Sequence, residues 1–335
     1  MKPFSSHATQ IQILKERGLL IKDEKFAQRI LSKENYYSVI NGYKKPFIRR
    51  DKKQLPEVPE KYTSGTTFED IHKLFLFDRQ LRSILLKELL KFENNIKAKI
   101  AYRFSEKFQE PDAYLKYENF SDNRKVIANR NKLIFTMDSL LKHNIDREKV
   151  NHPAIKHYHD NYHNVPLWVL VNFLTLGNIS YFYQVIDESL RNTIARDFAE
   201  EFNDEYFSIR LTTQNIENII KVANFHRNIC AHEEILYSFG LKKPISTTGL
   251  DKILNMPGGL LNKGNVFSVI SLLKIFLSKS EHDALIKELD ALASDLKKSM
   301  SSEPLQFIEK ALGLTEGWER YFPYSKKQLN KIDDK

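Results

Sequence analysis

Residues 67–108, TFEDIHKLFLFDRQLRSILLKELLKFENNIKAKIAYRFSEKF, decide the fold class of this chain. Apolar side chains recur in this stretch at steps of three and four residues, which is the period of one continuous helical face. Thr67 suits the N-cap of such a helix, and Glu69 and Asp70 follow in the first turn, where the helix dipole favours acidic groups. A helix of about 40 residues at about 1.5 Å per residue is roughly 60 Å long. The predicted apolar face comprises Leu74, Phe77, Leu81, Ile84, Leu85, Leu89, Phe92, Ile96, Ile100 and Phe104.

The rest of the chain also shows helical periods, and no alternation of polar and apolar residues indicates a strand ladder. We therefore predict an all-α protein. Gly42–Thr66 contains three prolines and no clear period, so it is predicted to be a loop, and a Gly- and Pro-rich break at Gly240–Gly264 precedes a C-terminal unit. The other predicted helices are His7–Arg17, Asp23–Ser32, Asn35–Asn41, Asn123–Leu141, Ala154–His159, Leu167–Leu176, Ile179–Ile186, Glu188–Glu201, Thr213–Tyr237, Val266–Ser278, Glu281–Ser299 and Pro304–Leu312.

These breaks predict three segments along the chain. Residues 1–66 form an N-terminal helical segment with a basic loop, residues 67–240 a helical core, and residues 241–335 a C-terminal helical extension.

The charge balance and the cysteine content limit the function. The 335 residues carry a net charge of +9, which favours a polyanionic partner, although a solvated lysine surface has the same balance. Cys230 is the only cysteine, so no intrachain disulfide can form, and we predict a cytoplasmic protein. No apolar run reaches the ~20 residues that a membrane span requires, so no membrane partner is expected. No glycine-rich phosphate loop, Ser-His-Asp order or paired-carboxylate motif is present, which argues against nucleotide hydrolysis and glycosidase chemistry.

The strongest candidate site is Arg227-Asn228-Ile229-Cys230-Ala231-His232, inside the predicted helix at 213–237. Asn228 and His232 are four residues apart and share a helical face, and the long Arg227 side chain can swing toward it. RNA cleavage without a metal requires a base, an acid and a cation that stabilises the phosphorane. Histidine suits either proton transfer near neutral pH, and the planar guanidinium of arginine suits phosphate oxygens. We predict His232 as general acid or base, Arg227 as the transition-state cation, and Asn228 as the residue that orients the histidine or donates to a phosphate oxygen.

The sequence leaves other interpretations of these residues open. An arginine and a histidine at such positions also serve as buried partners that satisfy helix contacts. Arg147 and His152 repeat the Arg-x4-His spacing without the asparagine, so we treat that match as chance. Metal sites are conceivable at His152, His157, His159 and His163, or at His226, Cys230 and His232. Interleaved Tyr and Asn residues favour a polar surface turn for the first set, and the core-type position of Cys230 favours a buried thiol, so we predict no metal and no cofactor.

The motif and several other blocks together resemble the Abi-like (AbiD/AbiF) abortive infection proteins of the HEPN superfamily. Arg-Asn-x3-His on a late helix is similar to the HEPN signature, and the blocks run in order from about residue 10 to residue 240. Asn172 departs from the pattern, because many relatives carry Glu there. The other blocks are Leu14–Leu19, Asn35–Tyr37, Gly42–Tyr43, Gly65–Phe68, Phe77–Arg82, Pro166–Val169, Leu176–Ser180 and Tyr183.

This resemblance implies a HEPN-type helical bundle with extra N-terminal helices and a C-terminal extension, and a metal-independent endoribonuclease that acts in phage defence. HEPN sites usually form where two such helices face each other. One motif supplies one histidine, whereas acid–base cleavage needs two proton carriers, so we expect a homodimer. A single histidine that works with water or Arg227 is the alternative. A function of a different class is an RNA-binding HEPN protein that holds a structured small RNA, with weak or restrained catalysis.

Basic side chains outside the motif are predicted to contact RNA. The loop that follows Gly42 interleaves aromatic and basic residues, which suits single-stranded RNA, although a solvated loop has the same composition. Arg79 is either the ion-pair partner of a core acid such as Glu93 or a second phosphate ligand. The predicted RNA-binding residues are Lys44, Lys45, Arg49, Arg50, Lys52, Lys53 and Arg79.

Overall fold

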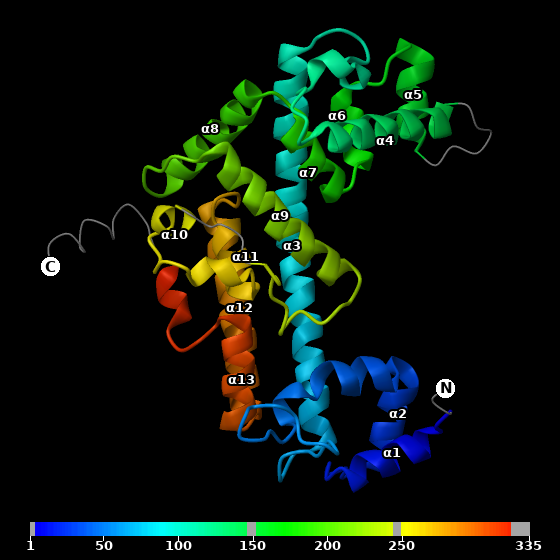
Figure 1. The fold of residues 1–335 in the computed structure, drawn as a ribbon, viewed down its shortest axis with the longest axis vertical. Coiled ribbons are helices and arrows are strands. Elements are labelled where there is room, and N and C mark those ends of the chain that lie inside the picture. Colours follow the sequence, from blue (N-terminus) through cyan, green and yellow to red (C-terminus); the bar gives the residue numbers. More distant parts are fainter. Residues whose placement is uncertain (1–3, 146–151, 244–248, 323–335) are drawn as a thin grey trace, which may run out of the picture. The chain divides into compact units, whose positions relative to one another are not determined.

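The chain is all-α, as predicted. The computed structural model describes residues 4–145, 152–243 and 249–322, and within these residues only isolated bridges, and no β-sheet, accompany the helices. Figure 1 shows the order of the helices along the chain. The α-helices are α1 (His7–Glu16), α2 (Glu24–Glu34), α3 (Phe68–Lys107), α4 (Ile127–Ile145), α5 (Pro153–Tyr162), α6 (Leu167–Leu170), α7 (Leu176–Val185), α8 (Glu188–Glu205), α9 (Thr213–Ala231), α10 (Leu250–Ile253), α11 (Val266–Leu273), α12 (Lys279–Ser299) and α13 (Ser302–Leu312).

The contacts divide the chain into two units, and each unit is assembled from separate stretches of sequence. Unit 1 comprises the described residues of 1–85, 229–240 and 285–319, and unit 2 comprises those of 86–228, 241–284 and 320–335. The helix α3 contributes its first part to unit 1 and the remainder to unit 2. The division of the chain into segments 1–66, 67–240 and 241–335 stays a prediction.

The helix α3 begins and ends within one residue of its predicted bounds. Thr67 and Asp70 cap it reciprocally, because the Asp70 N–H donates to Thr67 Oγ1 at 3.1 Å and the Thr67 N–H donates to Asp70 Oδ2 at 3.0 Å. Of the ten predicted apolar positions, nine are buried and Ile84 is half-buried. Aromatic side chains continue this face into both units, with ring-centre distances of 6.2 Å for Phe26–Phe68 in unit 1 and 5.4 Å for Phe104–Phe182 in unit 2.

The predicted helix Leu167–Leu176 is wrong in its C-terminal half. The helix α6 ends at Leu170, a 3-10 turn continues to Phe173, and α7 begins at Leu176. Thr175 explains the break, since it caps α7 together with Asn178: the Asn178 N–H donates to Thr175 Oγ1 at 3.2 Å, and the Thr175 N–H donates to Asn178 Oδ1 at 3.0 Å. A capping pair inside an apolar run therefore ended one helix and started the next. In unit 2, α7 packs against α4.

The most apolar helix, α11, lies in the core of unit 2. All eight of its residues are buried, and Asn265 and Ser268 cap it. In the described ranges, no helix combines the length and the apolar character that crossing a membrane requires.

The predicted helix Thr213–Tyr237 is wrong at its C-terminus. The helix α9 ends at Ala231, Glu233 adopts a left-handed backbone conformation with φ of 54°, and the Glu234 N–H donates to the Ile229 carbonyl at 3.0 Å. His232 is consequently the first residue after the helix rather than a residue in its interior.

Candidate functional site

The predicted motif lies at the C-terminal end of α9. Asn228 and His232 are exposed and Arg227 is half-buried, whereas Ile229 and Cys230 between them are buried. The polar members of the motif therefore face solvent, and the interpretation as a buried structural histidine does not describe His232. Cys230 is a buried thiol, as predicted, and burial raises its pKa to about 12.

Arg227 is held by an acidic side chain of α3 within unit 2. Its Nε donates to Glu93 Oε2 at 3.1 Å, and Lys97 Nζ donates to Glu93 Oε1 at 2.7 Å. Glu93 and Lys97 are 5% and 6% exposed, so one buried carboxylate serves two cations and one positive charge remains. The terminal nitrogens of Arg227 form no hydrogen bond to the part of the chain that the structure describes. They can therefore donate to a phosphate oxygen.

Arg79 does not pair with Glu93, so the suggested ion-pair partner is wrong. Its two terminal nitrogens donate to the carboxylate of Glu34 at the end of α2, at 3.1 and 2.7 Å. The guanidinium also lies 4.6 Å from the centre of the Phe75 ring. The hydrogen bonds from Arg79 lower the pKa of the Glu34 carboxyl. An ion pair with an acid is thus present, but the acid comes from the neighbouring helix of unit 1 rather than from α3.

His232 borders a pocket of about 680 Å³ that lies within unit 1. The end of α2, a π-helical turn at Tyr37–Asn41, one face of α3 and the segment His232–Ile235 line it. The Tyr37 side chain is 77% exposed, and Arg79 forms part of the wall. Arg227 and Asn228 do not line this pocket, so only the histidine of the motif opens onto it.

A buried carboxylate, Asp78, holds the segment that follows His232. It is fully buried on α3 in unit 1, and it accepts four hydrogen bonds whose donors compensate its charge. Arg82, one of these donors, also donates to the Glu234 carbonyl at 3.2 Å. This network fixes the chain just beyond the motif. The four donors are the backbone N–H of Leu236 at 3.0 Å, the backbone N–H of Tyr237 at 2.6 Å, the Tyr43 hydroxyl at 2.8 Å and Arg82 Nη1 at 2.7 Å.

Sequence reasoning gave no role at this site to Asp78 and Tyr37, although both lie in blocks that resemble the family. Asp78 had a signal, because it is an acid directly after Phe77 on an otherwise apolar helical face. Tyr37 belongs to a recognised block, Asn35–Tyr37, but nothing in the sequence indicates that its ring is exposed beside His232.

The basic loop is partly engaged in contacts of its own. Lys44 Nζ donates to Glu60 at 2.7 Å, and Arg50 donates to the carbonyls of Lys45 and Gln54 at 3.2 and 2.9 Å. The loop aromatics Tyr43 and Phe47 are buried in unit 1, so they present no face to an RNA base. The exposed cations of the loop, which form no ion pair with the described residues, are Lys45, Arg49, Lys52 and Lys53.

The remaining histidines form no recognisable centre. His157 and His159 lie on α5, and His163 follows its end. Among the described residues, no three His, Cys, Asp or Glu side chains are grouped closely enough to hold a metal ion. His226 is buried in unit 2, where it contacts the Val222 carbonyl at 2.9 Å. Of the second Arg-x4-His match, Arg147 lies outside the described residues.

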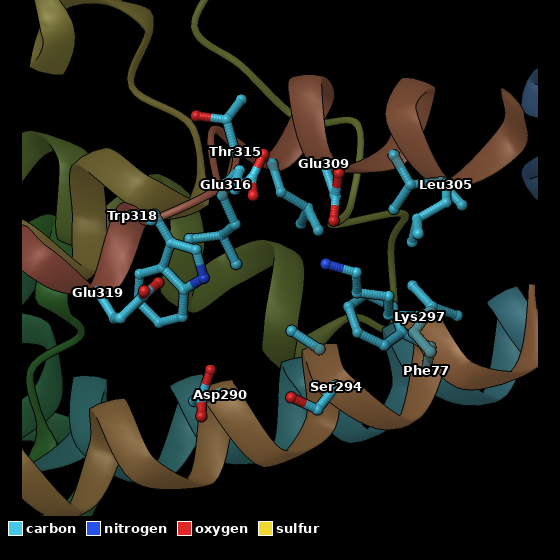
Figure 2. A pocket seen from close by; sticks show the side chains of 16 residues that line it. Phe77, Asp290, Ser294, Lys297, Leu305, Glu309, Thr315, Glu316, Trp318 and Glu319 are labelled. Carbon is cyan, nitrogen blue, oxygen red and sulfur yellow. The ribbon is translucent and has the colours of Figure 1, made fainter. Parts of the chain in front are cut away.

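Another pocket of unit 1, of about 220 Å³, is acidic and contains none of the predicted site residues. Figure 2 shows its walls, with Asp290 and Ser294 on α12, Glu309 on α13, and Trp318 in the segment that follows. Four carboxylates and a single lysine line it, so a phosphate group does not suit it.

Comparison with known proteins identifies a family. The sequence matches the family model of Abi-like proteins over residues 29–238, which is more than half of the chain and includes the whole of α3 and α9. No curated protein and no solved structure matches the chain significantly.

Proposed function

Because the chain belongs to the Abi-like protein family, which associates it with abortive infection as a defence against phage, we propose that it is an endoribonuclease whose catalytic residues are Arg227, Asn228 and His232. The substrate is RNA, and cleavage requires no metal ion.

The observation that carries this proposal is that the polar side chains of the motif at the end of α9 are accessible to a ligand. His232 and Asn228 are exposed, and Arg227 keeps its terminal nitrogens for a ligand while Glu93 anchors its Nε at 3.1 Å. An anchored guanidinium loses less conformational freedom when it binds a phosphate than a freely rotating one.

The reaction follows from these groups. The 2′-oxygen of the RNA attacks the adjacent phosphorus, and the bond from phosphorus to the 5′-oxygen breaks, which leaves a 2′,3′-cyclic phosphate and a 5′-hydroxyl. An imidazole accepts the 2′-hydroxyl proton, and a protonated imidazole returns a proton to the leaving oxygen. The Arg227 guanidinium stabilises the negative charge of the phosphorane, and Asn228 orients the histidine or donates to a non-bridging oxygen.

A homodimer supplies the second proton carrier. Each chain has one His232 in a motif of this kind, and a two-fold axis would bring two sets together. If the site is formed by a dimer, dilution that dissociates the dimer should lower the activity by more than the dilution factor.

The test is cleavage of RNA by the purified chain in the presence of a chelator. We expect His232→Ala to lose at least about 100-fold in rate, because a general acid or base contributes about 10²–10⁴-fold. His157→Ala, which changes an exposed histidine of α5, is the matched control and is expected to cut like the parent. Equal rates for His232→Ala and the parent, or cleavage of RNA with a 2′-deoxyribose at the scissile position, would contradict the proposal.

A second function is RNA binding with restrained catalysis. The four exposed cations of the loop support it, since a group of exposed basic side chains can follow an RNA backbone. A structured RNA that copurifies with the chain and suppresses its cleavage activity would favour this function over the first.

A further inference from the structure

We propose that the pocket beside His232 is a base subsite, which holds an unpaired nucleobase with an exocyclic amine from the RNA presented to that histidine. The inference rests on the proposed function, because it names the part of the substrate that this pocket recognises.

The size and position of the pocket suit a nucleobase. Its volume of about 680 Å³ lies within the range of about 300–1,000 Å³ that is usual for small-molecule sites. His232 forms part of its wall, so the ribose and phosphate attached to a base in the pocket can reach the imidazole.

The charges of the pocket argue for a base rather than a phosphate. Arg79 is already bound to Glu34 through two hydrogen bonds, and Arg82 is bound to the buried Asp78. Glu233 and Glu234 add two exposed carboxylates and Lys33 one exposed ammonium group, and none of the three has an ion pair with the described residues. The unpaired charge of the wall is therefore negative and disfavours a phosphate inside the pocket. Carboxylates accept hydrogen bonds from the amino groups of adenine, cytosine or guanine, whereas uracil has a carbonyl at C4, where cytosine has its amine, and offers only its ring N3–H to an acceptor.

The pocket also offers a stacking surface. The Tyr37 ring is 77% exposed, and Ile235, which also lines the pocket, is 38% exposed and adds an apolar surface. Exposed aromatic rings that stack on unpaired bases are a general means of binding single-stranded RNA.

The local backbone holds these groups in place before any ligand binds. Asn35 has a left-handed conformation with φ of 56°, and its side chain accepts a hydrogen bond from the Ser38 N–H at 2.9 Å, which starts the turn that carries Tyr37. Gly42 lets Ile235 approach closely, since a Cβ at residue 42 would lie 3.3 Å from Ile235 Cδ1. A preorganised pocket of this kind discriminates between bases at little entropic cost.

The test measures binding of short 2′-O-methyl oligouridines that contain one central A, C, G or U. These oligonucleotides lack a free 2′-hydroxyl, so their binding is measured independently of cleavage. Fluorescence anisotropy with the full chain is expected to show tighter binding of the amine-bearing bases than of the all-uridine oligonucleotide, by at least about fivefold. Tyr37→Ala should weaken binding of all four by about tenfold, and Tyr37→Phe should bind like the parent.

A double variant, Glu233→Gln with Glu234→Gln, separates base recognition from stacking. It should weaken the preference for amine-bearing bases, because each glutamine keeps only one neutral acceptor oxygen and gains an amide donor that suits the uracil carbonyl, while binding of the all-uridine oligonucleotide is retained. Tyr162→Ala, at a tyrosine of α5 that is 65% exposed, is the matched control and is expected to bind like the parent. Circular dichroism of each variant confirms that the fold is kept.

Each outcome decides one proposal. Parent-like binding by Tyr37→Ala, or an unchanged base preference in the double variant, would overturn the base subsite. Base-dependent binding by a parent chain that fails to cleave RNA would leave the subsite standing and reject the ribonuclease. If the chain cleaves RNA at a rate that depends neither on Tyr37 nor on the identity of the base, the ribonuclease stands and the base subsite is rejected.

Discussion

Asp78→Ala should destabilise the protein more than almost any other single substitution in unit 1. The carboxylate is fully buried, and it accepts from two backbone N–H groups, a tyrosine hydroxyl and a buried arginine at 2.6–3.0 Å. Alanine removes the counter-charge of Arg82, which is 4% exposed, and leaves the donors of Leu236 and Tyr237 without their acceptor.

The magnitude follows from these groups. Removing one partner of a buried ion pair costs about 3–5 kcal/mol, and each buried donor left without an acceptor costs about 1–3 kcal/mol. These contributions are not additive, because water that enters the cavity left by the carboxylate forms hydrogen bonds with some of the donors that lost their acceptor. We therefore expect a loss of about 4–6 kcal/mol in the free energy of unfolding, against a total of about 5–15 kcal/mol for a typical domain. Asp78→Asn keeps one acceptor oxygen and the shape, so about half of that loss is expected.

Urea denaturation measures the free energy of unfolding of both variants, and hydrogen exchange measures how well individual backbone amides are protected. The amides of Leu236 and Tyr237 should exchange faster in Asp78→Asn than in the parent, because their acceptor has lost its charge. Asp290→Ala changes an exposed acid of unit 1, and it should stay within about 0.5 kcal/mol of the parent. A loss below about 1 kcal/mol for Asp78→Ala, or equal losses for Asp78→Ala and Asp290→Ala, would refute the reasoning.

Three further predictions concern charge. Burial lowers the pKa of His226 from 6.5 to about 4, so between these values the unfolded chain binds a proton that the folded chain does not. His226 should therefore contribute about 3 kcal/mol to the fall in the free energy of unfolding as the pH drops through this window, and the buried His282, whose pKa is also lowered to about 4, adds a fall of its own. In urea titrations at several pH values, His226→Phe should remove the first contribution and leave the second. Glu93→Gln leaves Lys97 buried without its counter-charge, so we expect the free energy of unfolding to fall by about 3 kcal/mol. The same change removes the charged anchor of Arg227, so kcat of RNA cleavage should fall at least about tenfold while KM changes little. The four exposed loop cations are Lys45, Arg49, Lys52 and Lys53. Replacing all four with glutamine should weaken RNA binding equally for all sequences and reduce the slope of log K against log salt by about 3. Binding measured at several salt concentrations gives this slope.

The sequence alone determined the helices whose signals are local. The apolar period of α3, together with Thr67 and the acids of its first turn, predicts that helix to within one residue at each end. The same period identifies nine of the buried apolar side chains of this helix, but not its buried charged residues. The motif at Arg227–His232 is also visible in the sequence, because the identities and spacing of its residues carry the chemistry without any knowledge of their surroundings.

Only the tertiary structure decided where α9 ends and what surrounds the motif. The helical period of the sequence continues past Ala231, but the N–H groups of Leu236 and Tyr237 donate to a carboxylate 158 and 159 residues away, on Asp78. Arg79 likewise pairs with Glu34 across 45 residues, which no spacing rule predicts. Hydrogen bonds between residues distant in sequence leave no periodic signal, and for that reason the pocket beside His232 becomes visible only when the chain is folded.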